Sequence, residues 1–243
     1  MVRIYRPLPV ERLKLLVFDL DGTLIDSARD LCNSVNATLV HFGREALMDT
    51  EVAGFIGDGA LMLVRRALEQ GNRNGSPVDE DFLAQAYAYF LDYYREHKLD
   101  FTYAYAGVVE ALTALRQFPD GGPRSMAVLT NKPVRPAQAI CEALGLASFF
   151  THVYGGNSFA VKKPDPLGLR TLMDEAGALP EETVMIGDSE VDVLTARNAG
   201  VWSIGCTFGL SPEGLVANPP DVLVDSPQDW MAVLKPATFI LQQ

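Results

Sequence analysis

Two aspartates near the N-terminus leave the end of an apolar segment and enter a tight turn. Asp19 and Asp21 follow the run Leu15–Phe18, which has the length and composition of a strand buried on both faces of a parallel sheet. Gly22 comes next and allows the backbone to bend where a side chain would obstruct it. Because ligands bind open parallel sheets at the carboxyl ends of the strands, this turn is a candidate active site rather than a simple Asp-Gly turn.

Polar residues follow two further strand-like runs in the same way. Residues 126–129 end in Thr130 and Asn131, a hydroxyl and an amide that can donate hydrogen bonds to an anion. Residues 183–186 are followed, after one glycine, by Asp188. The pattern of the first turn is therefore repeated at the ends of other predicted strands.

Four carboxylates belong to this set, because Asp192 follows Asp188 in the same motif. Carboxylates at this density repel one another unless a hard cation lies among them, and oxygen ligands alone favour magnesium. Lys163 belongs to a Lys-Pro pair that precedes the predicted helix 167–176, and its ammonium then complements a phosphate. The residue types thus indicate a Mg²⁺ cofactor and a small phosphorylated metabolite as substrate.

These four motifs, in this order, resemble those of the haloacid dehalogenase superfamily of phosphohydrolases. The matching segments are Asp-x-Asp-Gly-Thr at 19–23, Thr-Asn at 130–131, Lys-Pro at 163–164, and Gly-Asp-Ser at 187–189 with Asp192. The match runs over the whole chain outside the termini. It implies an α/β core of the Rossmann-like type found in that superfamily.

The resemblance also implies a mechanism. Asp19 would attack phosphorus and form an aspartyl-phosphate, while Asp21 would act first as general acid and then as general base. Thr130, Asn131 and Lys163 would hold the phosphoryl oxygens as charge gathers on them.

A metal site and further substrate contacts follow from the same resemblance. The metal would be held by the Asp19 carboxylate, the Asp21 main-chain carbonyl and Asp188, with Asp192 supporting it from nearby. Gly22 and Thr23, in the first motif, are expected to contact the substrate.

Within the superfamily the chain is most similar to the bacterial phosphoglycolate phosphatases, in segments 21–27, 56–60, 129–133 and 155–156. This similarity implies hydrolysis of 2-phosphoglycolate to glycolate and phosphate. The alternatives are a phosphatase of another small sugar phosphate or of pyrophosphate, and a phosphotransferase similar to β-phosphoglucomutase. A dehalogenase would leave Asp21 idle because it has no alkoxide to protonate. A protein that only binds a ligand would be expected to have lost a catalytic group.

The spacing of the apolar residues divides the chain into two parts. Between residues 26 and 100 they recur at helical intervals, with a Gly- and Asn-rich break at 71–77. Farther along, strand-like and helical runs alternate, which is typical of a parallel sheet with helices on both faces. We therefore predict that residues 1–25 and 101–243 form the α/β core and that residues 26–100 form a helical cap domain inserted after the first strand.

A small-residue turn of this insert contains Gly57 and Gly59. It lacks the last glycine of a dinucleotide fingerprint and does not follow a strand. By resemblance it faces the core site, so both glycines are expected to contact the substrate, together with Arg66 on the helix that follows. Arg65 could also bind a substrate carboxylate, although a salt bridge on the helix surface is the simpler interpretation. We interpret the tyrosines between residues 87 and 105 as packing between cap helices.

Composition limits the classes of partner. The 243 residues are 48% hydrophobic and carry a formal net charge of −11, which argues against nucleic acid, whose binding depends on basic residues. The first 12 residues carry three arginines and no apolar core, and no run approaches a membrane span, so we expect a cytoplasmic protein without membrane association. Three widely separated cysteines, Cys32, Cys141 and Cys206, are expected to be buried thiols. The oligomeric state is not indicated.

Overall fold

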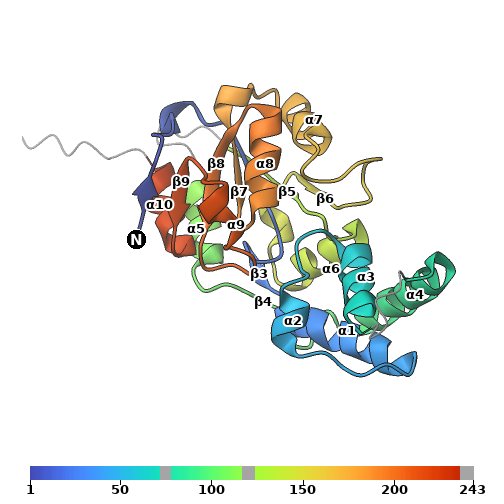
Figure 1. The fold of residues 1–243 in the computed structure, drawn as a ribbon. Coiled ribbons are helices and arrows are strands. Elements are labelled where there is room, and N and C mark those ends of the chain that lie inside the picture. Colours follow the sequence, from blue (N-terminus) through green and yellow to red (C-terminus); the bar gives the residue numbers. More distant parts are fainter. Residues whose placement is uncertain (72–77, 117–123, 236–243) are drawn as a thin grey trace, which may run out of the picture.

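A mostly parallel sheet forms the main body of the computed structural model, which describes residues 1–71, 78–116 and 124–235 (Figure 1). Its seven strands lie in the order β1-β9-β8-β7-β2-β5-β6, and only the short edge strand β1 runs antiparallel to its neighbour. The strands span Arg3–Ile4 (β1), Leu15–Phe18 (β2), Ser125–Leu129 (β5), His152–Tyr154 (β6), Thr183–Gly187 (β7), Trp202–Cys206 (β8) and Val222–Val224 (β9). The predicted α/β fold is confirmed.

Strand β2 occupies the centre of the sheet, and all four of its residues are buried. It pairs in parallel with β5 on one side and β7 on the other, so that Phe18 lies opposite both Val128 and Ile186. This register brings the residues that follow the three strands to one edge of the sheet, where ligands bind in open α/β folds.

Helices cover both faces of the sheet, which explains why β2 is apolar on both sides. Leu16 and Phe18 pack on one face against α5, α6 and α10, whereas Leu15 and Val17 pack on the other against α7 and α8. These core helices, with the short α9, span Val108–Leu115 (α5), Val134–Ala143 (α6), Leu167–Ala176 (α7), Glu190–Ala199 (α8), Gly214–Ala217 (α9) and Pro227–Leu234 (α10). Single 3-10 turns lie at Val10–Arg12, Ala147–Phe149 and Pro180–Glu182.

The four helices that follow β2, α1 to α4, form a second group to one side of the sheet (Figure 1). They span Ala28–His41 (α1), Asp49–Ala53 (α2), Ala60–Gln70 (α3) and Glu80–His97 (α4), and they enclose an apolar cluster of their own. In the described part of the chain, residues 27–100 contribute no strand to the sheet. The predicted break at 71–77 falls almost wholly on residues 72–77, outside the described ranges.

The helical group joins the core through two adjacent linkers. The linkers form the short antiparallel pair β3 (Ile25–Asp26) and β4 (Tyr103–Ala104). Beside this pair, the buried Asp30 carboxylate on the first turn of α1 accepts hydrogen bonds from the main-chain N–H groups of Phe101 and Thr102 and from the Thr102 hydroxyl, at 2.7–3.1 Å. One carboxylate thus ties the returning linker to the outgoing helix.

Two further expectations concern composition. Cys32, Cys141 and Cys206 are buried free thiols, as predicted. Among the residues that the structure describes, no helix combines the length and apolar character needed to cross a bilayer.

Replacing Asp30 with alanine should lower the free energy of unfolding by at least about 2 kcal/mol, because two amides and a hydroxyl lose their acceptor inside the protein. Urea unfolding followed by circular dichroism measures the change. Asp174→Ala, at an exposed position of α7, is the matched control and should stay within about 0.5 kcal/mol of the parent. Equal stabilities of the two variants would contradict the role assigned to Asp30.

Candidate functional site

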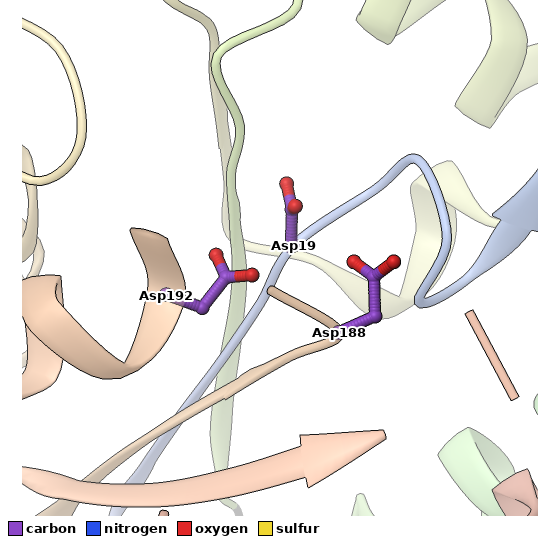
Figure 2. Close-up of side chains that lie close together, drawn as sticks. All are labelled: Asp19, Asp188 and Asp192. Atoms are coloured by element: carbon purple, nitrogen blue, oxygen red, sulfur yellow. The ribbon is translucent and has the colours of Figure 1, made fainter. Parts of the chain in front are cut away.

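Three aspartates converge at the carboxyl edge of the sheet (Figure 2). Asp19 follows β2, Asp188 follows β7, and Asp192 lies on the first turn of α8. One carboxylate oxygen from each can be chosen so that all three lie within 4.8 Å of one another. Two predicted metal ligands, Asp19 and Asp188, are therefore close together, and the third carboxylate is that of Asp192.

Lys163 contacts this cluster directly. Its ammonium lies 2.9 Å from Asp19 Oδ1 and 2.6 Å from Asp192 Oδ1. Burial opposes the charge on this lysine, but Asp19 and Asp192 outweigh that effect and raise the pKa of Lys163. Lys163 is therefore a buried cation held between two of the aspartates.

One ammonium does not balance the charge of three carboxylates. Burial raises the pKa of Asp19 to about 6, with Lys163 acting against the shift and Asp192 adding to it. Burial, followed by repulsion from Asp192 and Asp19, raises the pKa of Asp188 well above its usual value. The donor set is made only of oxygen atoms and carries excess negative charge, which suits a divalent hard cation such as Mg²⁺.

Main-chain donors fix the position of Asp188. Its Oδ2 accepts hydrogen bonds from the N–H groups of Leu210 and Ser211 at 2.7 and 3.0 Å, and its Oδ1 accepts one from the Thr23 hydroxyl at 3.4 Å. Gly22, with φ +83°, passes so close that a Cβ atom there would lie 2.1 Å from Asp188 Oδ2. In the structure, Gly22 and Thr23 therefore shape the surroundings of Asp188, and their predicted contact with substrate stays a prediction.

Asp21 lies apart from the three-carboxylate cluster and has partners of its own. Its Oδ1 accepts a hydrogen bond from the Ser27 hydroxyl at 2.5 Å, and the Lys132 ammonium lies 2.9 and 3.1 Å from its two oxygens. Burial disfavours the charged lysine, but Asp21 and the Tyr94 side chain more than compensate, and the pKa of Lys132 is raised. Our prediction of the site did not include Lys132. Its position directly after the Thr130-Asn131 motif could have indicated it.

Asn131 joins the core to the helical insert. Its Nδ2 donates to the carbonyl oxygens of Gly57 and Lys163, at 3.2 and 3.1 Å. Thr130, one residue earlier, is buried at the end of β5, and its hydroxyl oxygen accepts a hydrogen bond from the main-chain N–H of Lys132. The side chain of Asn131 is thus engaged in holding Gly57 and Lys163 beside the site.

The glycine turn of the insert faces the core site, as expected. Besides Asn131, the Lys162 ammonium donates to the Asp58 carbonyl, and the Ser211 hydroxyl donates to the Ile56 carbonyl. Gly59, with φ +88°, precedes α3, and a Cβ atom there would lie 2.8 Å from the Asn131 carbonyl oxygen. Only a glycine allows this close approach of the two backbones.

Neither of the two arginines in the middle of α3, Arg65 and Arg66, lines the cavity above the aspartates. Arg66 pairs with Asp58 and donates to the Phe55 carbonyl, whereas Arg65 forms a two-pronged ion pair with Glu80. Both guanidinium groups are therefore engaged within the insert, and the substrate contact predicted for Arg66 stays untested.

A cavity of about 40 Å³ lies between the sheet edge and the insert. The core lines it with polar side chains, among them Asp19, Asp21 and Lys132, and the insert lines it with largely apolar ones, such as Leu63 and Phe90. This volume accommodates only ~3 water molecules, fewer non-hydrogen atoms than any phosphate ester contains.

The family model for haloacid dehalogenase-like hydrolases matches residues 16–206 of the chain. This span includes both aspartates of the first turn, Lys163 and the Asp188–Asp192 motif.

Two curated relatives and one solved structure are similar to this chain over most of its length. A phosphoglycolate phosphatase of Vibrio parahaemolyticus is 36% identical over 223 residues, which cover 91% of this chain and 96% of the relative. One of Pseudomonas putida is 38% identical over 87% of this chain and 76% of its own length. The crystal structure of a predicted phosphoglycolate phosphatase from Haemophilus somnus superposes with a TM-score of 0.85 at 31% identity, covering 92% of this chain and 99% of that one.

Removing one charge from the cluster should stabilise the metal-free protein. A carboxyl whose pKa is raised by folding destabilises the native state as the pH rises above its unfolded-state pKa, and the loss is complete above its folded-state pKa. For Asp188 the causes of the raised pKa are burial and two neighbouring carboxylates. Asp188→Asn should therefore raise the unfolding temperature in a chelator at neutral pH by about 2–4 °C, which is the effect of ~1 kcal/mol in a chain of this size.

Added Mg²⁺ should raise the unfolding temperature of the parent protein, because a ligand that binds only the native state stabilises it, and should leave that of Asp188→Asn nearly unchanged. Differential scanning fluorimetry measures both responses. The exposed Asp174→Asn serves as the control and should respond like the parent. A lower unfolding temperature of Asp188→Asn in the chelator would contradict the argument from charge crowding.

Proposed function

We propose that this chain, which belongs to the haloacid dehalogenase-like hydrolase family, is a magnesium-dependent phosphomonoesterase that works through a phosphorylated aspartate and acts on 2-phosphoglycolate. The observation that carries the proposal is the position of Asp19 at the end of the central strand, within a buried carboxylate cluster and in contact with Lys163. This arrangement offers a nucleophile, a cation for phosphoryl oxygens and a metal site in one small cavity.

The metal would be held by Asp19, Asp188 and the main-chain carbonyl of Asp21, with Asp192 close by. Support comes from the oxygen-only donors within 4.8 Å of one another and from the raised pKa values of Asp19 and Asp188. When bound, Mg²⁺ would neutralise the repulsion between the nucleophile and the phosphate dianion.

Asp19 supplies the nucleophile of the first step. One of its carboxylate oxygens attacks phosphorus, the ester P–O bond breaks, and the bonding electrons leave with the alkoxide oxygen. Lys163 and Thr130 stabilise the negative charge that gathers on the phosphoryl oxygens. Asn131 supports this arrangement by holding the main chain at Lys163.

Asp21 is the proposed general acid and general base. It gives a proton to the departing alkoxide and then takes one from the water molecule that cleaves the aspartyl-phosphate, which releases phosphate and regenerates Asp19. Ser27 and Lys132 both contact its carboxylate and hold it beside the cavity that Asp19 also lines. Positioning of this kind is worth as much to a general acid as its proton affinity.

The relatives named phosphoglycolate phosphatase support a small acidic phosphate ester as substrate. The cavity itself does not discriminate between esters, because ~3 water molecules fill it and the insert would have to move to admit any of them. Another small sugar phosphate and pyrophosphate are the competing substrates, and a phosphotransferase reaction is the competing chemistry.

Residues 26–100 act in this proposal as a cap. Contacts of Gly57, Asp58 and Ile56 with the core close the site, and their release would open it for exchange of substrate and product. The proposal includes a cytoplasmic location, consistent with a small phosphorylated metabolite as substrate.

A panel of phosphorylated metabolites assayed with Mg²⁺ tests the substrate. Phosphate release from 2-phosphoglycolate should exceed that from glucose 6-phosphate, ribose 5-phosphate and pyrophosphate by at least about tenfold in kcat/KM, the effect of ~1.4 kcal/mol of transition-state binding. A preference for a sugar phosphate or pyrophosphate would reject 2-phosphoglycolate and retain the phosphatase. Conversion of one sugar phosphate isomer into another would favour the phosphotransferase.

Asp19→Asn tests the covalent step. The variant should fold and lose at least about 10⁴-fold in kcat, because an amide cannot replace the nucleophile. Intact-protein mass spectrometry of the parent, quenched with acid during turnover, should detect a phosphoryl adduct that is absent from Asp19→Asn. Asp174→Asn is the control and should match the parent in both assays. Near-normal turnover by Asp19→Asn would rule out the aspartyl-phosphate.

A further inference from the structure

Tyr94, on α4, brings a polar group to the apolar side of the cavity. The insert lines the cavity with Leu31, Leu63, Phe90 and other apolar side chains, and Tyr94 lines it beside them. Only 2% of Tyr94 is exposed. Its ring stacks on Phe90, with centroids 5.6 Å apart and planes at 10°.

The hydroxyl of this tyrosine has no acceptor for its proton among the described residues. Lys132 is close, with its ammonium 4.8 Å from the ring centroid, but an ammonium can only donate. Burial raises the pKa of Tyr94 to about 12, although the charge of Lys132 acts against the shift. The hydroxyl therefore keeps its proton at neutral pH and offers it as an unused hydrogen-bond donor.

A phenylalanine at position 94 would keep the ring contact with Phe90 without burying an unpaired hydroxyl. A buried polar group without a partner costs stability, and such groups persist where they serve a ligand. The charged neighbour indicates which ligand fits. A hydroxyl donor and an ammonium beside it are complementary to a carboxylate, which accepts two or more hydrogen bonds.

We propose that the Tyr94 hydroxyl and the Lys132 ammonium together form the subsite for the carboxylate of the substrate, while its phosphoryl group lies at Asp19. The inference rests on the proposed function, since it names the groups that select an acidic phosphate ester. In this arrangement Lys132 contacts both the carboxylate of the substrate and Asp21, the proposed general acid. Arg65 and Arg66 are engaged with Glu80 and Asp58 and are not needed for it.

Tyr94→Phe is the informative variant, because changing Lys132 would also disturb Asp21. The readout is the ratio of kcat/KM for an acidic ester to that for a neutral ester of similar size. One pair is 2-phosphoglycolate and 2-hydroxyethyl phosphate, and a second is 3-phosphoglycerate and glycerol 3-phosphate. The parent should prefer the acidic ester of at least one pair, and Tyr94→Phe should lower that ratio by about tenfold or more, the usual effect of one hydrogen bond to a charged group.

Tyr93→Phe is the matched control. This tyrosine is the next residue on the same helix, and its ring stacks between Tyr89 and His97. Loss of its hydroxyl should leave the ratio at the parental value. Thermal unfolding adds a second readout, in which Tyr94→Phe should be at least as stable as the parent because the proton of the removed hydroxyl has no acceptor to lose.

The remaining outcomes separate the carboxylate subsite from the proposed substrate. An unchanged ratio in Tyr94→Phe, or a marked fall in its unfolding temperature, overturns the subsite and leaves the phosphoglycolate proposal standing if the parent hydrolyses that ester. Preference for 3-phosphoglycerate without activity on 2-phosphoglycolate, with the ratio lowered in Tyr94→Phe, supports the subsite and rejects the substrate. A parent enzyme that prefers neither acidic ester overturns both.

Discussion

Repulsion among buried carboxylates at the ends of adjacent parallel strands is the constraint on which the rest of the site depends. Asp19, Asp188 and Asp192 approach within 4.8 Å, and their burial is compensated by a single buried ammonium, that of Lys163. Such a cluster persists only because the surrounding backbone determines it, through the amides at Leu210 and Ser211 and the close passage of Gly22. The stability given up here is what makes the site receptive to a divalent cation and to a phosphoryl group.

The helical insert completes the cavity through a few polar contacts with the core. The linkers pair as β3 and β4, Asp30 ties the returning linker to α1, and the glycine turn is held at Asn131 through the Gly57 carbonyl. These contacts involve mainly main-chain carbonyls of the turn, so they depend on the path of its backbone more than on its side chains. In the proposed function, these few hydrogen bonds would hold the cap when it is closed, and their release would open the site.

Two buried lysines supply the positive charges of the site. Lys163 contacts the aspartates at the edge of the sheet, and Lys132 lies between Asp21 and Tyr94. In both cases neighbouring groups outweigh the effect of burial and raise the pKa, so each lysine stays charged without contact with bulk water. Two buried ammonium groups thereby lie among the carboxylates of the site in a protein whose formal net charge is −11, and an ammonium can donate hydrogen bonds to the oxygens of an anionic substrate.

The sequence alone determined the family, the α/β fold and the positions of the aspartates, because each depends on residues that are neighbours along the chain: an apolar strand followed at once by its polar turn. Tertiary structure alone decided the pairing of side chains. Lys132 and Asp21 are 111 residues apart, and their contact depends on the parallel register of β2 and β5. The prediction that the tyrosines between residues 87 and 105 pack within the insert is right for Tyr94 but wrong for Tyr105, which packs against the core, and for Tyr103, which is exposed. The sequence also could not reveal that the hydroxyl of Tyr94 lacks an acceptor. Nor could it show that Arg66 is engaged by Asp58, since the availability of a polar group depends on every neighbour that packing brings to it.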